Sequence, residues 1–427
     1  MELLQQVRII DPVGKIDRLG DVWLEGGEIK LIGDRLTDYP ADATIIPPSD
    51  LILGTGLVDL YSHSGEPGNE TRETLAALAQ AAARGGFTQV GILPDTFPAL
   101  DSAETIAALK QKANLLSGDS PLATSWSHLN LWGAAGHLAT QKMNPLGELE
   151  AQTVGFAGSY DLSGLSLLKQ VLEYVQPWQK PVAIALHQNE LTGKGVVREG
   201  EVSIRYGMTG NPSYSEAAII AAVLEIAAEM PSMLHIMRVS TRRGVELIAE
   251  AKARGVNVTA STTWMHLLWH SEAVSSFSSN LRLEPPLGSE LDRRALAEGV
   301  RQGIIDAIAI DHQAYTYEEK TVAFALAPPG VVGLELALPL LWQRFVATGA
   351  WTALELWQAL SHRPRQCMLQ QPQAIASGNS ADLVLFAPQE KWLANRDNLK
   401  SPGVNTPWYN QEITGRVVRT WTGSVPT

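Results

Sequence analysis

One order of features repeats along most of this chain: an amphipathic helical segment, a glycine, and then a short apolar run. In the clearest case, residues 73–84 carry apolar side chains at helical spacing, stop at Gly85-Gly86 and lead into the apolar run 87–93. The same order predicts helices over 215–230, 242–253 and 293–301, and strands over 233–239, 256–260 and 305–310. Helices alternating with apolar strands indicate parallel strands that helices cover.

The two ends of the chain have a different sequence pattern. Residues 1–53 contain short β runs separated by Gly, Pro and Asp, and residues 381–386 and 416–421 look alike. We therefore expect a composite β-sandwich from residues 1–53 and 372–427. Residues 54–371 are expected to form an α/β domain, a (β/α)8 TIM barrel. A doubly wound open sheet is the alternative for this middle part.

Charge and cysteine content exclude several classes of function. The 33 Lys and Arg against 45 Asp and Glu give a net charge of −12, which argues against binding to nucleic acid or to an anionic membrane. We see no secretory signal and no apolar run of about 18 residues, so a cytoplasmic protein without a membrane span is expected. The single cysteine, Cys367, excludes an internal disulfide and is expected in the core.

Chemistry in such barrels is carried by residues at the carboxyl ends of the strands. Four apolar runs end in suitable residues: Tyr61-Ser62-His63, His187, His235 to Arg238, and Asp311. Tyr61 and His63 point to the same face of a strand, whereas His235 and Arg238, three residues apart, point to opposite faces. One histidine at a strand end is more often structural, but several strand ends together favour a site. We expect structural or surface roles for the other histidines: His128, His137, His266, His270 and His362.

At these residues the chain resembles bacterial dihydroorotases, the zinc enzymes that close carbamoyl aspartate to dihydroorotate in pyrimidine biosynthesis. Residues 56–60 and 66–68 resemble the family's segment GLIDLHVHLREPG, and residues 83–88 resemble its AAGGFT. Further collinear matches lie at 199–203, 239–241, 257–260, 306–309, 318–320, 333–335 and 381–384. The resemblance covers nearly the whole chain and implies the barrel of the metal-dependent amidohydrolases.

The resemblance also implies that the metal site is depleted. The family's His-x-His is Tyr61-Ser62-His63 here, so one imidazole is replaced. The bridging carboxylate, an Asp or a carbamylated Lys, falls on Gly158, and Asp161 nearby is out of register. The histidine of the family's HVAHVST falls on Arg238. His63, His187 and Asp311 match retained ligand positions.

Substrate-binding positions are changed as well. The family's arginine in LREPG is Gly65, which removes a bidentate carboxylate clamp. Two asparagines become Asp95 and Glu284, and these place negative charge where a dianionic substrate would bind. The remaining changes are an arginine to Gly288 and a histidine to Tyr315. Each charge reversal costs about 2–5 kcal/mol of binding when the pair is buried.

Two hypotheses follow. In the first, the chain is a catalytically inactive dihydroorotase homologue without zinc, because the Arg238 guanidinium supplies the positive charge and cannot ligate a metal. The resemblance then implies a structural or regulatory role, as a partner of aspartate carbamoyltransferase and as a homo-oligomer. In the second, His63, His187 and Asp311 hold one zinc or other divalent metal in an active cyclic amidohydrolase that acts on dihydroorotate or an altered substrate, with Asp311 as the base. We favour the first.

Overall fold

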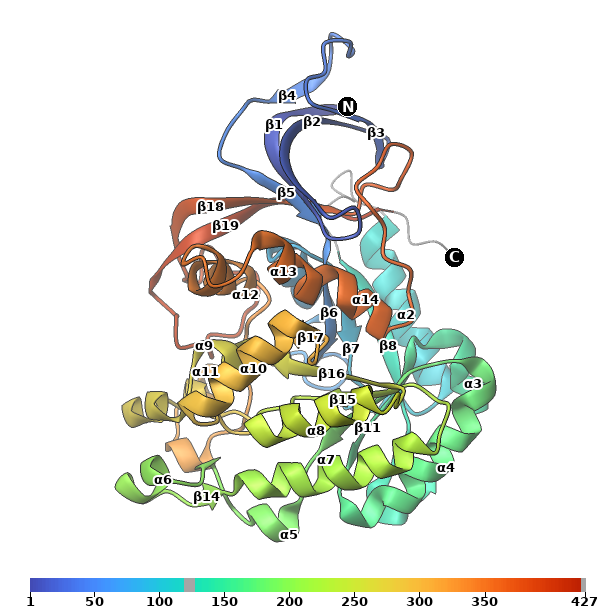
Figure 1. Ribbon diagram of the computed structural model, residues 1–427, viewed down its shortest axis with the longest axis vertical. Helices are drawn as coiled ribbons and strands as arrows, with labels where there is room; N and C mark the ends of the chain where they lie inside the picture. The colour runs from blue at the N-terminus through green and yellow to red at the C-terminus, as the bar shows by residue number, and fades with distance from the viewer. Residues whose placement is uncertain (119–126, 424–427) are drawn as a thin grey trace.

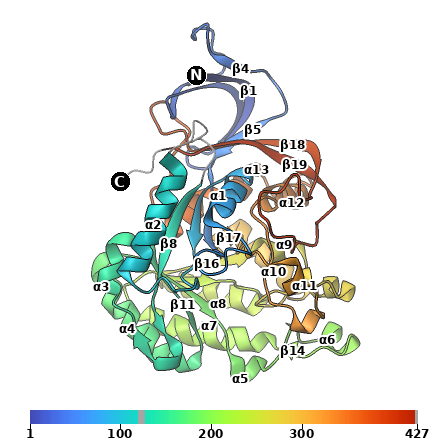
Figure 2. The ribbon, with the colours of Figure 1, turned by 180° about the vertical axis from the view of Figure 1, so that it is seen from behind.

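The computed structural model describes residues 1–118 and 127–423. It contains a barrel surrounded by helices and a separate sheet that both ends of the chain build (Figure 1). In this view the sheet lies above the barrel, and the view from behind shows the same arrangement (Figure 2). No helix in the described ranges is both long and apolar enough to cross a membrane.

Eight parallel strands form the barrel. They are β6 (Leu57–Ser62), β7 (Phe87–Ile92), β8 (His128–Ala134), β11 (Gly155–Tyr160), β12 (Val182–Leu186), β15 (Leu234–Met237), β16 (Val258–Thr263) and β17 (Ala307–Ala309), and they pair in this order. The last strand meets the first where the Asp311 amide donates to the Tyr61 carbonyl over 3.2 Å and the His63 amide donates to the His312 carbonyl over 2.9 Å. These bonds draw β17 to β6, so the barrel is confirmed and the open sheet is wrong.

Long helices cover the barrel: α1 (Leu75–Arg84), α2 (Ala103–Gly118), α4 (Leu165–Val175), α7 (Ser213–Ala228), α8 (Arg242–Ala253) and α10 (Glu290–Gln302). Local sequence sets the ends of α1, since the Thr74 hydroxyl accepts from the Ala77 amide and Gly85-Gly86 follows the last turn. A Cβ at Gly85 would collide with the Leu334 carbonyl, and Gly86 has a φ of +87°. Glycine is therefore required where the chain turns from this helix into β7.

Shorter elements connect these units. They are α3 (Leu146–Leu149), α5 (Asn189–Thr192), α6 (Glu201–Arg205), α9 (Trp264–Leu268), α11 (Tyr317–Lys320), α12 (Ala337–Leu341), α13 (Ala353–Trp357) and α14 (Arg363–Cys367). Two short strand pairs, β9 (Gly136–His137) with β10 (Lys142–Met143) and β13 (Val197–Arg198) with β14 (Gly210–Asn211), lie outside the barrel sheet. Cys367 is buried, as expected, and burial raises the pKa of its thiol.

The ends of the chain meet in one seven-stranded sheet. Its strands are β1 (Glu2–Asp11), β2 (Ile16–Glu25), β3 (Glu28–Gly33), β4 (Thr44–Ile46), β5 (Ile52–Thr55), β18 (Leu383–Leu393) and β19 (Glu412–Trp421). Strand β18 pairs antiparallel with β5, which joins the C-terminal strands to the N-terminal ones. The expectation that the two ends pack together is confirmed, and hydrogen bonds run through a single curved sheet (Figure 1). The exact domain boundaries stay a prediction.

Candidate functional site

Three barrel strands bring the central candidate residues together. Tyr61 and His63 lie at the end of β6, Arg238 follows β15 and Asp311 follows β17. Arg238 and Asp311 both have left-handed backbones, with φ of +58° and +52°. This conformation costs a residue with a Cβ about 1–3 kcal/mol, so the surrounding contacts must hold it in place. It also ends the regular alternation of β15, which places Arg238 at the barrel mouth.

Arg238 and Asp311 form a bidentate ion pair. Arg238 Nε lies 2.8 Å from Asp311 Oδ2, and Nη2 lies 2.6 Å from Oδ1. The same Nη2 lies 2.9 Å from His63 Nε2. The two charged side chains are 17% and 16% exposed, so water screens the pair weakly. Burial alone would raise the pKa of Asp311, but Arg238 and His63 hold it below its usual range.

His63 connects this pair to a second carboxylate. Its Nδ1 lies 2.6 Å from Asp95 Oδ2, and its Nε2 lies 3.4 Å from Asp311 Oδ1. Burial would lower the pKa of the imidazole, but Asp95 and Asp311 raise it to about 9. The contact with Arg238 favours a neutral ring that accepts at Nε2, whereas the two carboxylates favour the charged ring. The charged form prevails because two carboxylates contact this one imidazole. We call His63, Asp95, Arg238 and Asp311 the charge cluster.

Tyr61 lies behind the charge cluster and holds Arg238 in place. Its hydroxyl accepts from the Arg238 backbone amide over 3.0 Å and lies 2.9 Å from Ser261 Oγ. Its ring centroid lies 5.7 Å from the guanidinium carbon of Arg238, within cation–π range. Tyr61 is fully buried, and burial raises the pKa of its phenol. The replaced imidazole has thus become a support for the arginine.

His235 belongs to the barrel core rather than to the mouth. Its Nε2 lies 2.9 Å from Ser261 Oγ and its Nδ1 lies 2.9 Å from Thr259 Oγ1. Burial, with a smaller contribution from Lys252, lowers its pKa to about 3. A neutral imidazole joins Tyr61 through Ser261, and no sequence pattern had drawn attention to this serine because it lies on a third strand, β16.

The position of the bridging carboxylate is filled by a neighbour. A Cβ at Gly158 would lie 2.8 Å from Cε2 of Tyr160, whose ring is 2% exposed and whose hydroxyl has no hydrogen-bond partner in the described chain. Asp161 accepts from the Ser163 and Gly164 amides and so caps a helical turn. The aspartate therefore does not take the place of the missing bridge. No sequence pattern indicates that Tyr160 fills this space.

His187 stands apart from the charge cluster. Its Nδ1 lies 2.9 Å from Ser159 Oγ, and it lines a cavity of about 510 Å³ that Arg238 also borders. A second cavity of about 230 Å³ is lined by His63, Arg238, Asp311 and two of the changed substrate positions, Glu284 and Tyr315. The two cavities meet at Arg238 and Glu284.

The changed substrate positions have found partners within the chain. Glu284 lies 3.3 Å from Arg282, and Asp95 contacts His63. The Tyr315 hydroxyl donates to the Pro329 carbonyl over 3.0 Å, and its ring centroid lies 4.8 Å from Arg72 Cζ and 5.3 Å from Lys320 Nζ. The expected negative charges are therefore compensated locally rather than presented bare to a ligand.

Two glycines at these positions leave no room for a side chain. A Cβ at Gly65 would collide with the backbone oxygens of Glu73 and Asn69. A Cβ at Gly288 would lie 2.7 Å from the Asp292 Cβ and 2.9 Å from the Ser240 carbonyl oxygen. The loops have closed over both positions, so an arginine could not be restored at either without moving the backbone.

These residues do not fit the metal centre that the resemblance implies. Both oxygens of Asp311 accept from Arg238, and His63 Nε2 faces the same guanidinium. Those are the atoms that would coordinate a metal, and an arginine has no lone pair with which to replace them. In residues 1–118 and 127–423, no three His, Cys, Asp or Glu side chains are grouped so that they could hold a metal ion.

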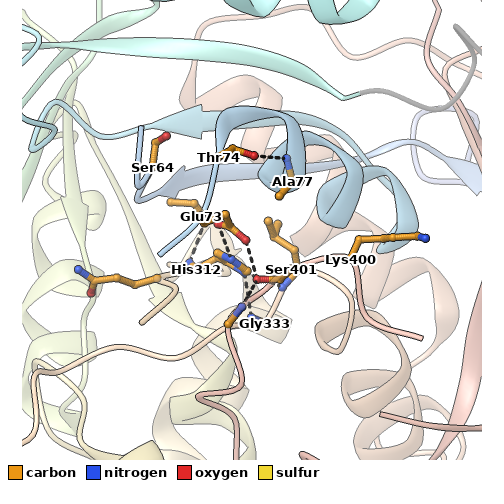
Figure 3. A network of polar contacts seen from close by, with 12 residues as sticks. Ser64, Glu73, Thr74, Ala77, His312, Gly333, Lys400 and Ser401 are labelled. Atoms are coloured by element: carbon orange, nitrogen blue, oxygen red, sulfur yellow. Dashed lines mark hydrogen bonds and ion pairs between the residues drawn. The ribbon is translucent and has the colours of Figure 1, made fainter. Parts of the chain in front are cut away.

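The residue after Asp311 points into a different environment. His312 Nδ1 accepts from the Gly333 amide, so the ring proton lies on Nε2, 3.0 Å from Glu73 Oε2 (Figure 3). Ser401 Oγ donates to Glu73 Oε1 over 2.5 Å, and the Ser401 amide donates to Glu335. His312 and Glu73 are each 1% exposed. We call Glu73, His312, Glu335 and Ser401 the buried clamp, since it joins α1, the end of β17 and the C-terminal segment.

Comparison with known proteins agrees with this architecture. Residues 50–121 match the family model described as dihydro-orotase-like. A probable dihydroorotase-like protein of Synechocystis sp. is 42% identical over an alignment of 443 positions. The alignment covers 97% of this chain and 98% of that protein. A dihydroorotase of Syntrophus aciditrophicus is 32% identical, with coverage of 98% and 97%.

Solved structures agree in fold. An L-hydantoinase (dihydropyrimidinase) from Arthrobacter aurescens superimposes with a TM-score of 0.83 at 20% identity, over 100% of this chain and 97% of that one. A D-hydantoinase (dihydropyrimidinase) from Thermus sp. gives a TM-score of 0.80 at 21% identity. With full-length relatives above 30% identity and a barrel of the same form, this chain belongs to the dihydroorotase-like family of cyclic amidohydrolases.

Proposed function

We propose that this chain is a catalytically inactive member of its family, which works in pyrimidine biosynthesis as a structural or regulatory partner of aspartate carbamoyltransferase. One observation carries the inactivity: the Arg238 guanidinium lies on Asp311 and His63, where a metal would need their lone pairs. The chain keeps the barrel and aligns with its relative over nearly the full length of both proteins. This supports a role that depends on shape rather than turnover.

The chemistry of the charge cluster explains the loss. Opening or closing a cyclic amide requires an activated water and a Lewis acid on the carbonyl. A guanidinium can neutralise nearby charge, but it cannot bind a water and lower its pKa as a metal does. Asp311, the candidate base, directs both oxygens at Arg238. Its pKa is held low by that pair, so it is a poor proton acceptor.

The changed substrate-binding positions also support the proposed loss of activity. Position 65 has neither an arginine nor space for one, so a carboxylate clamp is missing there. Asp95 places a carboxylate beside His63. A dianion such as dihydroorotate would meet this carboxylate without the cation that the family uses.

Three strongly exposed apolar side chains on separate surface segments are the positions at which we place association. Phe97, Ile204 and Leu326 are 77%, 81% and 78% exposed. Burial of such side chains would favour contact with a partner or with another copy of the chain. We therefore include a homo-oligomer and a complex with aspartate carbamoyltransferase in the proposal.

Metal analysis tests the inactivity directly. The purified chain, incubated with zinc and then desalted, should retain far less than one zinc per chain and should not turn over dihydroorotate. The double variant Tyr61→His, Arg238→His frees Asp311 and His63 and serves as the matched control; its zinc content should rise towards about one per chain. Stoichiometric zinc in the unaltered protein, lost together with activity in His187→Ala and Asp311→Asn, would overturn the proposal in favour of a single-metal amidohydrolase.

Association is tested separately. The chain and the aspartate carbamoyltransferase of the same organism should sediment together in analytical ultracentrifugation at micromolar concentration. The co-sedimentation of the variants Ile204→Glu and Leu326→Glu should be compared with that of Glu225→Gln. Glu225→Gln changes an exposed residue that pairs with Arg254. Independent sedimentation of the two unaltered proteins would contradict the partner role while leaving the inactivity untouched.

A further inference from the structure

Arg198 differs from the other buried arginines of the described chain. Arg282, Arg293 and Arg365 each have a carboxylate within ion-pair distance. Arg198 is 5% exposed, yet its partners are all neutral: Asn211 Oδ1 at 3.0 Å, Ser240 Oγ at 2.7 Å and the Pro286 carbonyl at 3.3 Å. Among the residues that the structure describes, its Nε has no partner. A buried cation whose direct partners are all neutral is costly to maintain, so the surroundings of Arg198 require an explanation.

This arginine lies in the wall of the larger cavity. The cavity measures about 510 Å³, within the range that holds small molecules, and Lys194, Arg282 and His187 line it as well. Arg282 Nε also lacks a partner in the described chain. Arg198 and Arg282 thus place two guanidinium groups in the wall of one cavity.

The charges around the cavity do not balance. Arg238 is matched by Asp311, and Arg282 by Glu284. Glu216 accepts from the amides and hydroxyls of Ser240 and Thr241, and the Ser240 hydroxyl separates it from Arg198. Lys194 is exposed and has no ion-pair partner within the described ranges. Counting Glu216 against Arg198 still leaves the positive charge of Lys194 over the cavity.

We propose that the larger cavity binds a small monocarboxylate, with Arg198 as the group that holds its carboxylate and Lys194 at the rim. A planar guanidinium fork matches a planar carboxylate, and one negative charge balances the surplus. Strand β13, paired with β14, fixes Arg198 beside the cavity before any ligand arrives. Asn189 and Gln188 in the same wall offer amides to the polar remainder of the ligand. The proposal goes beyond the proposed function, since it requires binding without turnover.

Calorimetric titration of the full chain with N-acetylglycine tests this site, with N-acetylglycinamide as the uncharged match. We expect saturable binding of the acid and no binding of the amide. Arg198→Gln keeps a hydrogen-bonding side chain beside Asn211 and should weaken the acid about tenfold or more, because it removes the charged fork. Lys194→Gln, at an exposed position, should weaken it about threefold. Arg254→Gln, which breaks a surface pair with Glu225, should leave binding unchanged.

Four outcomes would overturn the proposal: no saturable heat with the acid up to about 10 mM, equal binding of the amide, sulfate binding as tightly as the acid, or full affinity in Arg198→Gln. If Arg198→Gln does not fold, as judged by circular dichroism, Lys194→Gln and the comparison of acid with amide decide the question. None of these results depends on whether the chain binds zinc or turns over dihydroorotate, so the two proposals can fail independently.

Discussion

The charge cluster and the buried clamp contain neighbouring residues, Asp311 and His312. The two groups differ in how far their charged side chains are exposed and in what they hold together. In the charge cluster, three largely buried side chains and the more exposed Asp95 neutralise one another next to two cavities. In the buried clamp, Glu73 and His312 are almost inaccessible to water and join segments far apart in sequence. The cluster combines two replaced family positions, Asp95 and Arg238, with two retained ones, whereas the clamp holds the barrel to the C-terminal segment.

The difference shows which polar groups a scaffold can exchange. At the barrel mouth, an arginine and a tyrosine replaced two imidazoles, and the new groups found partners in Asp311, His63 and Ser261. The exchange is tolerable because each new polar group has a hydrogen-bond or ion-pair partner within the barrel. In the clamp each acceptor has a specific donor and no water to replace it, so an exchange there would leave a buried group unpaired.

The largest effect should come from breaking the clamp. Glu73→Ala removes the acceptor of both His312 Nε2 and Ser401 Oγ and leaves two buried donors unpaired. We expect the free energy of unfolding to fall by about 3–5 kcal/mol, measured by urea denaturation. Glu70→Ala, at an exposed position on the same loop, is the control. An equal loss in both variants would show that the clamp stabilises the fold no more than a surface residue does.

The second effect is the pH dependence of the free energy of unfolding, which differs between the clamp and the charge cluster. Burial raises the pKa of Glu335 in the clamp to about 7, and the carboxylates raise that of His63 in the cluster to about 9. Both folded pKa values exceed the unfolded ones, so the folded state binds more protons and stability falls as pH rises. The loss should span about pH 4.5–7 for Glu335 and about pH 6.5–9 for His63, at about 1–3 kcal/mol each.

Unfolding at a series of pH values measures these windows. Glu335→Gln should flatten the lower window and leave the upper one, and His63→Gln should do the reverse, so each variant controls for the other. A lower window that persists in Glu335→Gln would assign it to another group, and would remove the contrast between the two regions.

The smallest effect concerns the support of Arg238. Tyr61→Phe removes the hydroxyl that accepts from the Arg238 amide and contacts Ser261, but keeps the ring beneath the guanidinium. We expect a loss of about 1–2 kcal/mol in the free energy of unfolding, since one buried donor is left unpaired. Thr105→Val, which removes a hydroxyl bonded to Ser102 on the surface side of α2, is the comparison. No difference between the two would show that Arg238 keeps its backbone conformation without Tyr61.

Much of the fold was predictable because its signals are local. Helix α8 has the bounds 242–253 that the periodicity predicts, and Gly85-Gly86 ends α1 as expected. Strand β17 is shorter than the apolar run 305–310, and α10 starts earlier than predicted because Ser289 and Asp292 cap each other. Boundaries depend on such side-chain contacts, and periodicity does not contain them.

The site was predictable only in part. The sequence pointed to Tyr61, His63, Arg238 and Asp311, because family motifs and strand ends mark them. It did not show that Asp95 would neutralise His63, nor that Tyr160 would fill the space beside Gly158. Arg198 carried a weak signal, a charge at the end of the apolar pair Val196-Val197. A charge in that place is equally common in a surface strand, so only its burial gave it meaning.

By itself, the sequence determined the alternation of helices and strands, the sheet built from both ends and the family to which the chain belongs. The elements and the terminal sheet follow from the spacing of apolar residues and glycines, which act over a few neighbouring positions, and the family follows from the resemblance of its motifs. The tertiary structure alone decided which charges meet. Asp311 and Arg238 are 73 residues apart and Glu73 and Ser401 are 328 apart. Such pairs are set by barrel closure and by the distances at which electrostatic forces act inside a protein.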